Sequence, residues 1–195
     1  MEWIKKARIC MALTLCASLG LTGILLLLEG RGRDALPLHL CGLSALCAAA
    51  AAARPRAWML DVLWYLGMPG ALLALLFPAP AVARFQLGMN FSYAVTHLLI
   101  LAVPAALMLQ GMRPNRGKAP VMLLLLNLIA LPVYGVNRLL GSDYLFLMAP
   151  PAGTPLEAVF SLGIPAYIIV LETVMLLGCM GMEKLAALLF RETGK

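Results

Sequence analysis

The chain has 195 residues, of which 63% are hydrophobic and 12% charged, and its net charge is +6. Soluble domains are roughly half apolar and about a quarter charged, and a core of this length cannot hide so large an apolar excess, which excludes a soluble globular protein. The basic residues lie in short segments between apolar runs, which favours determinants of membrane topology and excludes a nucleic-acid-binding face.

Apolar runs of about 20 residues, the length that a bilayer-spanning helix needs, recur along the whole sequence. The first is longer than the core of a cleaved signal peptide, so we interpret it as an uncleaved helix. Gly67 and Pro69 interrupt the third run and Pro104 interrupts the fourth, which predicts kinks packed against protein. The predicted fold class is all-α, a single polytopic domain over residues 1–195 that forms a six-transmembrane-helix bundle. Its expected spans are about residues 9–28, 36–53, 57–77, 91–110, 119–140 and 156–180.

The distribution of lysine and arginine predicts the orientation. Eleven of the 15 basic residues fall on the side that holds both ends of the chain, and four fall on the other side. Because cytoplasmic loops are enriched in lysine and arginine, both termini are expected in the cytoplasm. The expected location is the cell membrane, as a multi-pass protein of the bacterial cytoplasmic membrane.

The second predicted span combines a proline start with small residues. Pro37 stands where proline commonly opens a helix. Gly42, Ala45, Ala49 and Ala52 then recur at helical spacing, which favours close packing against neighbouring helices.

Cys41 and His97 are the candidate catalytic residues. They lie near the outer starts of the second and fourth predicted spans, at a shared depth of about 7–9 Å for a rise of about 1.5 Å per residue. A thiolate is a nucleophile, and an adjacent imidazole can generate it. Cys41 is expected beyond the first helical turn, where the helix dipole contributes little. A filler cysteine and a packing histidine are the alternatives.

Other polar residues have weaker signals. His39 is a poorer base for Cys41, because residues two apart lie on nearly opposite helix faces. Asn137 and Tyr144, at the outer end of the fifth span, are expected to contact a lipid headgroup or an oxyanion, with interfacial anchoring and loop capping as the alternative. Glu172, deep in the sixth span, is expected to be a structural polar residue bonded to another helix. The spacing of the five cysteines predicts neither a metal site nor a disulfide framework.

Several segments together resemble a known family. LPLHLC, WYLGMPGALLALLFP, THLLI, MRP and VNRLLGSDYLFL are similar to segments of the YwaF-type bacterial membrane proteins. They also resemble the relatives of transmembrane protein 164, a lipid acyltransferase, and more distantly the androgen-induced membrane hydrolases of fatty-acid esters. The resemblance covers about residues 36–172. It implies a six-helix fold and a cysteine–histidine acyl-transfer dyad, which by position is Cys41 and His97, and its pattern includes His39, Asn137, Tyr144 and Glu172.

The chain departs from this family pattern at three places. Gly42 stands where an acidic residue usually follows the cysteine, and Asp143 stands where asparagine usually precedes the tyrosine. Ala149-Pro150 replaces the usual Lys-Pro. These departures leave the dyad intact and bear on headgroup recognition.

The predicted function is therefore a membrane-embedded lipid acyltransferase or lipid esterase that works near the outer leaflet. Cys41 and His97 would move an acyl chain through a thioester, with a phospholipid or lysophospholipid as substrate and no cofactor. His39, Asn137 and Tyr144 are the expected substrate contacts. The alternative is a small six-helix substrate-binding subunit of a membrane transporter, in which these three residues bind a solute. A scaffold without chemistry is a third possibility, and the sequence identifies no protein partner.

Overall fold

The protein is described from a computed structural model that covers residues 2–78, 84–151 and 153–190. Over these residues the chain contains helices and no strand, which confirms the prediction of an all-α protein. The chain divides into two compact units, the first ending at Asn115 and the second being Arg116–Arg191. The C-terminal residues Arg191 and Lys195, used above to predict the orientation, lie outside the described residues.

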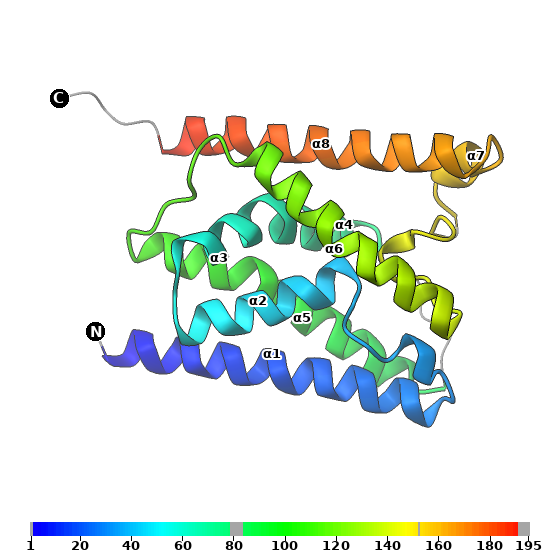
Figure 1. Cartoon of the computed structure of the whole chain (residues 1–195). Helices are drawn as coiled ribbons and strands as arrows, with labels where there is room; N and C mark the ends of the chain where they lie inside the picture. The colour runs from blue at the N-terminus through cyan, green and yellow to red at the C-terminus, as the bar shows by residue number, and fades with distance from the viewer. Residues whose placement is uncertain (1, 79–83, 152, 191–195) are drawn as a thin grey trace. The chain divides into compact units, whose positions relative to one another are not determined.

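The first unit is built from four helical runs that pack on one another (Figure 1). Its elements are α1 (Glu2–Leu28), η1 (Gly32–Asp34), α2 (Leu40–Ala53), α3 (Ala57–Val62), η2 (Leu63–Gly67), α4 (Met68–Leu76) and α5 (Gln86–Leu109). Helix α2 contacts α1, α5 and the run from α3 to α4, so it is the central element of this unit.

The second unit contains α6 (Ala119–Leu140), η3 (Tyr144–Phe146), α7 (Leu156–Phe160) and α8 (Ile164–Leu189). The predicted sixth span over residues 156–180 is wrong in its boundaries, because α7 and α8 are separate helices. Gly163, with a φ of +107°, breaks the chain between them, and α8 continues to Leu189. At the far end of α8, Nη2 of Arg116 donates to the carbonyl of Phe190 (2.8 Å) and satisfies a helix-terminal acceptor.

Within the described residues, five helical runs have the length and composition to cross a membrane, and α2 does not reach that length. The five are Glu2–Leu28, Ala57–Leu76, Gln86–Leu109, Ala119–Leu140 and Ile164–Leu189. Helix α2 has 14 residues, or about 21 Å of helix, against the roughly 30 Å of a hydrocarbon core. The expected span of residues 36–53 therefore starts too early, because residues 36–39 are not helical.

Alanines on α2 allow this short helix to lie between larger ones. Ala45, Ala48, Ala51 and Ala52 are fully buried and belong to the core, together with Leu15 of α1 and residues of α3 and α5. Side chains of one carbon let helix backbones approach closely, which is the main source of packing between helices in lipid. The prediction that the small residues of this segment serve close packing is confirmed.

The run from α3 to α4 contains a π-helical turn at Leu63–Gly67. The N–H of Met68, directly after the turn, donates to the carbonyl of Leu63, five residues earlier. Pro69 follows directly, and because proline has no N–H and its ring would clash with the carbonyl four residues earlier, the regular ladder cannot continue there. All five residues of the turn are buried. The predicted interruption is thus a widened turn packed against protein.

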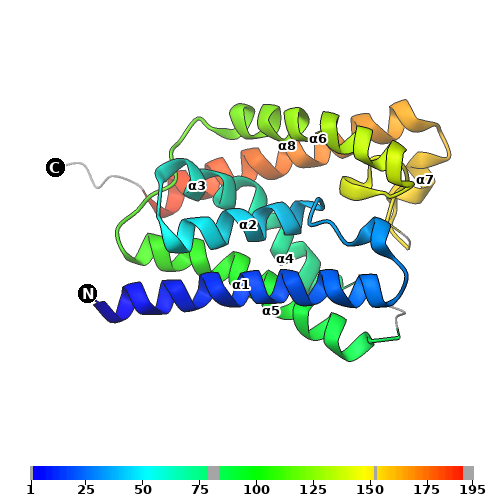
Figure 2. The ribbon, with the colours of Figure 1, turned by 60° about the horizontal axis from the view of Figure 1, so that its bottom comes forward.

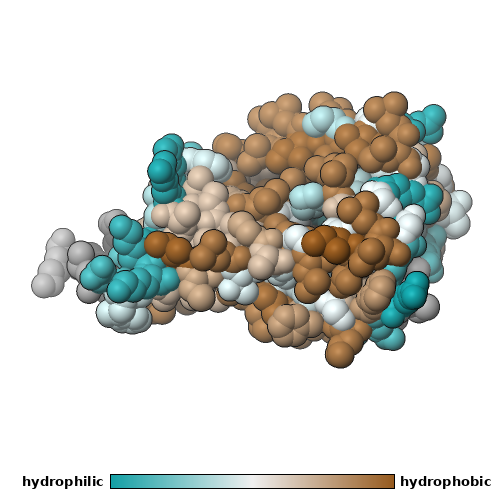
Figure 3. All heavy atoms as spheres, turned by 90° about the horizontal axis from the view of Figure 1, so that it is seen from below, coloured by the Kyte–Doolittle hydropathy of each residue, from teal (hydrophilic) through white to brown (hydrophobic). Residues whose placement is uncertain are grey.

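Helix α1 carries the apolar exterior expected of a helix that contacts lipid. Leu13, Ile24, Leu27 and Leu28 are exposed along it. On the face shown in Figure 3, hydrophobic side chains occupy the middle and hydrophilic side chains gather toward the two ends. Such a band between polar ends is the pattern of a transmembrane surface.

Candidate functional site

Cys41 lies in the first turn of α2. The helix starts at Leu40, with His39 as its extended N-cap residue (φ −67°, ψ 155°). The first hydrogen bond of the ladder runs from the Leu43 N–H to the His39 carbonyl (3.0 Å), so the N–H groups of Leu40, Cys41 and Gly42 precede it. The expectation that Cys41 lies beyond the first turn is wrong. Its thiol is at the positive end of the helix, where N–H donors favour an anion.

Gly42 fits against the chain that precedes α2. A Cβ atom on Gly42 would lie 2.6 Å from the carbonyl oxygen of Pro37 and 2.9 Å from its Cα. The sequence predicted that Pro37 opens the helix, and this is wrong. Pro37 precedes the helix and packs over its first turn. Because no Cβ fits here, the acidic residue of the family pattern is excluded in this conformation, which gives the departure at Gly42 a physical reason.

His97 is buried in α5, with 3% of its surface exposed. Its Nδ1 is 2.7 Å from the carbonyl oxygen of Tyr93, one helical turn earlier. A carbonyl only accepts hydrogen bonds, so this contact places the proton on Nδ1 and leaves the lone pair on Nε2. The imidazole is thus held in the tautomer that serves as a base.

Gly67 brings α2 and α5 together close to both candidate residues. A Cβ atom on Gly67 would lie 3.4 Å from Cβ of Ser44 on α2 and 3.4 Å from Cγ2 of Ile100 on α5. Ser44 lies three residues after Cys41, and Ile100 lies three residues after His97. Helices α2 and α5 run in the same direction (Figures 1 and 2). Cys41 and His97 therefore both lie about one helical turn before a common contact point.

Both figures also show that α2 begins well inside the end of α1 that joins η1 (Figures 1 and 2). His97 lies about three turns after Gln86, the first residue of α5. His97 is thus farther from the start of its helix than the 7–9 Å expected from the sequence, whereas Cys41 is the second residue of α2. A non-helical segment leads into α2, and such backbone is tolerated in a membrane where protein covers it.

Tyr93 is the residue of this site that the sequence reasoning missed. Its ring lies 4.1 Å from the imidazole of His97, centroid to centroid, at an angle of 41°. Its phenol also lies within electrostatic range of Cys41. Within the described residues the structure shows no hydrogen bond between the Cys41 thiol and the His97 imidazole. The dyad therefore stays a prediction. The i, i+4 spacing of Tyr93 and His97 was the sequence signal that could have identified Tyr93.

Hydroxyl groups fix α5 against α1 next to the site. Oγ of Ser18 lies 2.8 Å from Oγ of Ser92 and 2.7 Å from Oγ1 of Thr96, and Thr22 joins the same group at 2.6 Å from Oγ of Ser92. Thr96 directly precedes His97. In an apolar surrounding such bonds contribute modestly to stability, on average about 0.6 kcal/mol each, and here they fix the rotation of α5 that turns His97 inward.

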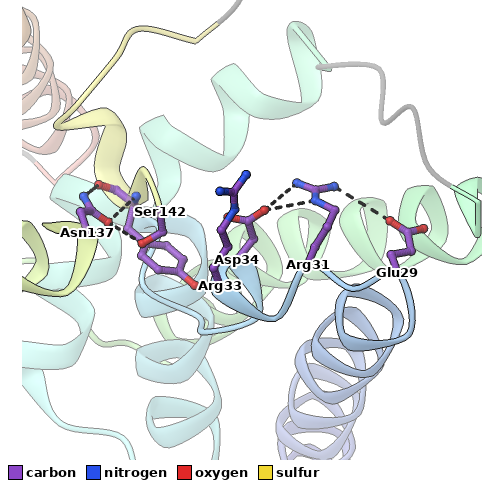
Figure 4. Close-up of polar contacts among 7 residues, drawn as sticks. Glu29, Arg31, Arg33, Asp34, Asn137 and Ser142 are labelled. Atoms are coloured by element: carbon purple, nitrogen blue, oxygen red, sulfur yellow. Dashed lines mark hydrogen bonds and ion pairs between the residues drawn. The ribbon is translucent and has the colours of Figure 1, made fainter. Parts of the chain in front are cut away.

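The loop between α1 and α2 is held by ion pairs (Figure 4). Arg31 contacts Asp34 through Nη2 and Nε, both at 3.1 Å. It also lies 4.0 Å from Glu29, whose other oxygen accepts the N–H of Phe85 at 3.1 Å. These contacts tie the ends of α1 and α5 to the segment that leads into α2.

The other predicted site residues belong to the second unit, whereas Cys41, His39 and His97 belong to the first. The Asn137 side chain, near the end of α6, makes three hydrogen bonds to the segment that follows (Figure 4): Nδ2 donates to the Tyr144 carbonyl (2.9 Å), and Oδ1 accepts from the Tyr144 N–H (2.8 Å) and from Ser142 (3.1 Å). Asn137 is buried, and so is Tyr144. The arrangement is a clamp on the GSDYLFL segment.

This segment has a strained backbone that side chains hold in place. Leu145 and Phe146 have φ values of 60° and 54°, which residues other than glycine rarely adopt. The hydroxyl of Tyr167 donates to the Phe146 carbonyl (2.6 Å), and Oδ1 of Asp143 accepts the Met148 N–H (2.8 Å). Asparagine has the same acceptor at Oδ1, so the change to Asp143 keeps this loop contact.

Glu172 contacts the neighbouring helix of its unit. Its Oε2 accepts a hydrogen bond from Nδ2 of Asn127 on α6 (3.0 Å). Both residues, with Tyr134, line a largely apolar groove of about 440 Å³ between α6 and α8. Within residues 2–78, 84–151 and 153–190, no group of three or more His, Cys, Asp or Glu side chains is placed to hold a metal ion.

In a comparison with protein families, the model of the TMEM164 family matches residues 3–183. No curated protein and no solved structure matches the chain. The family match covers nearly the whole sequence, including both candidate catalytic residues, and it confirms the resemblance to transmembrane protein 164. With five helical runs of membrane-spanning length and composition, the chain is therefore a multi-pass membrane protein that belongs to the TMEM164 family.

Proposed function

We propose that this protein is a membrane-embedded lipid acyltransferase or lipid esterase in which Cys41 is the nucleophile and His97 the general base. The observation that carries the proposal is the junction at Gly67, from which Cys41 and His97 are each one turn distant on helices of the same direction. Membership of the TMEM164 family supports it, since that family resembles membrane proteins that act on lipid esters.

In the first half-reaction, Cys41 takes the acyl group from a lipid ester. Nε2 of His97, which carries the lone pair, accepts the thiol proton as Sγ attacks the ester carbonyl. The carbon–oxygen ester bond then breaks. His97 returns the proton to the leaving alkoxide, and the products are a lysolipid and an acyl thioester on Cys41.

Backbone N–H groups at the start of α2 would stabilise the charges that develop. Those of Leu40, Cys41 and Gly42 precede the first hydrogen bond of the helical ladder. Fixed donors in a water-poor site stabilise a thiolate or an oxyanion far more than they would in water.

In the second half-reaction, an acceptor removes the acyl group from the thioester. His97 takes the proton of a lysolipid hydroxyl or of water, the oxygen attacks the thioester carbonyl, and the proton passes to the departing sulfur. A lysolipid acceptor gives acyl transfer and water gives hydrolysis. The proposal includes a site toward the outer leaflet of the cell membrane, with both termini in the cytoplasm. His39 would contact the substrate from the start of α2.

The test is intact-protein mass spectrometry after incubation with mixed phospholipids, with lysolipid measured in the same sample. We expect a fatty-acyl mass on the wild-type protein that hydroxylamine removes. Cys41→Ala should abolish the adduct and the lysolipid, and His97→Ala should slow lysolipid formation by about 100-fold or more, the usual contribution of a general base.

Cys47→Ala is the matched control, because Cys47 is a partly buried cysteine on the same helix. It should leave both readouts unchanged. If wild type forms neither adduct nor lysolipid with any phospholipid mixture, the acyl-transfer proposal is overturned. Solute binding by a transporter subunit, which Cys41→Ala should barely affect, then becomes the assay.

A further inference from the structure

Tyr93 links three helices of the candidate site. It lies on α5, its phenol donates to a carbonyl of α4, and the phenol lies within electrostatic range of Cys41 at the start of α2. No role for this residue follows from the Cys41–His97 chemistry by itself. The contacts around Tyr93 nevertheless decide how the imidazole of His97 is held.

The phenol group of Tyr93 is fixed by an acceptor that the helix leaves open. Its hydroxyl donates to the Ala74 carbonyl near the end of α4 (2.6 Å). In a continuing helix the N–H of residue 78 would donate to that carbonyl, but residue 78 is proline and has no N–H. The Tyr93 hydroxyl takes its place, so the ring is anchored at its far end.

The anchored ring in turn confines the imidazole. The two rings lie 4.1 Å apart at 41°, and the Tyr93 carbonyl binds the His97 Nδ1 proton at 2.7 Å. One residue thus provides both the surface on which the imidazole packs and the acceptor that selects its tautomer. A base held by such a second residue transfers protons more effectively, because small errors in geometry cost large factors in rate.

Resting on the function proposed above, we propose that Tyr93 is the positioning residue of this site, holding His97 as a base for the Cys41 thiol through the ring anchored on Ala74. Tyr93 does not contact the reacting bond in this role. Its side chain acts through His97, and the bond to Ala74 acts through Tyr93.

The test measures the reactivity of Cys41 toward iodoacetamide, which requires no lipid substrate. The protein carries alanine at Cys10, Cys16, Cys47 and Cys179, so that alkylation reports Cys41 alone. The readout is the ratio of the rate constant at about pH 7 to that at about pH 9.5, where hydroxide removes the thiol proton more readily and an assisting base matters less. A change in access or folding alters both rate constants, whereas loss of an assisting base lowers only the first.

We expect His97→Ala and Tyr93→Leu each to lower this ratio by about tenfold, since both remove an effective base. Tyr93→Phe keeps the ring and loses the anchor, so it should lower the ratio by about threefold, less than Tyr93→Leu does. Tyr65→Phe is the matched control. It removes another hydrogen bond from a phenol to a backbone carbonyl in the same unit, from Tyr65 to Asn115 (2.9 Å), and should leave the ratio unchanged.

Two results overturn the inference in distinguishable ways. If His97→Ala lowers the ratio and neither Tyr93 variant does, the dyad stands and Tyr93 has no positioning role. If His97→Ala leaves the ratio unchanged, His97 is no base for Cys41, and the inference falls together with the dyad. Should Tyr93→Leu fail to fold, Tyr93→Phe compared with Tyr65→Phe still decides between a lowered and an unchanged ratio.

Discussion

At the scale of single residues, several side chains of this protein complete backbone hydrogen bonds that the helices leave open. The Tyr93 hydroxyl donates to the carbonyl of Ala74, which proline at residue 78 cannot bind. Asn137 satisfies both the N–H and the carbonyl of Tyr144. Buried Asp61 accepts the N–H and the side-chain amide of Asn115, at 2.7 and 2.8 Å. Because the bilayer offers no water for such groups, each unsatisfied one costs several kcal/mol.

Gly42 carries the residue-scale prediction. Gly42→Ala places a Cβ within 2.6–2.9 Å of the Pro37 backbone, so the segment before α2 must move. We expect a loss of about 1–3 kcal/mol in the free energy of unfolding, as for other overpacked sites. The acyl adduct on Cys41, one residue away, should also be lost. Thermal unfolding in detergent and intact-protein mass spectrometry measure the two effects.

Gly135→Ala serves as the control for Gly42→Ala. A Cβ at Gly135 meets nothing within 4 Å, and alanine is the better helix former in α6. It should leave stability unchanged or raise it slightly. Equal stability of the two variants would show that Pro37 does not pack on Gly42 as described.

At the scale of elements, α2 determines where the candidate nucleophile lies. It is shorter than its neighbours, begins inside the unit and has alanine at its contacts with α1 and α5. The π-helical turn opposite it ends at Gly67, where α2 and α5 meet. Small residues on α2 and in the π-helical turn thus produce a close junction with Ile100 of α5, and the N-terminus of α2 is placed beside α5 as a consequence.

Ala48→Leu tests this packing. Ala48 is fully buried between helices, and three added carbons have no space there, so we expect a loss of about 1–3 kcal/mol of stability. Ala50→Leu makes the same change two residues later on the exposed side of α2 and should have little effect. Unfolding of both variants in detergent is the measurement. A similar loss for the two would mean that α2 is not packed through its alanine face.

At the scale of the whole molecule, the number of membrane crossings depends on α2. Five helical runs are long enough to cross, and five crossings would place the termini on opposite sides. If α2 and the non-helical segment before it together make a sixth crossing, both termini lie on one side. The division of the basic residues into 11 and four, with both ends of the chain on the more basic side, is that of the six-crossing arrangement.

Reporter fusions in bacterial cells test this topology. We expect green fluorescent protein to fluoresce at both termini, because it folds only in the cytoplasm, and alkaline phosphatase to be inactive at both. A fusion of alkaline phosphatase after residue 31, in the loop between α1 and α2, is the positive control and should be active. Activity at one terminus and fluorescence at the other would contradict a sixth crossing by α2.

The expected spans that agree best with the observed helices are those whose hydrophobic pattern is determined by contact with lipid. The fifth expected span, residues 119–140, coincides with α6, and the third differs from Ala57–Leu76 by one residue. Long apolar runs of this kind are visible in the sequence because a bilayer requires a minimum length. The second and sixth spans were wrong at their ends because α2 starts late and Gly163 divides α7 from α8. Both features depend on packing and loop geometry rather than on hydropathy.

The sequence by itself determined the class of protein, the helical segments and the pair of residues to consider, because hydropathy and rare reactive side chains are local properties. The family resemblance added the expected chemistry. Only the tertiary structure decided that Cys41 lies in the first turn of α2 and that Pro37 packs over Gly42. Only it revealed that Tyr93 lies against His97 and is anchored on Ala74. The physical reason is that these features arise where residues far apart in sequence meet, and close packing and the need to satisfy buried polar groups determine those meetings.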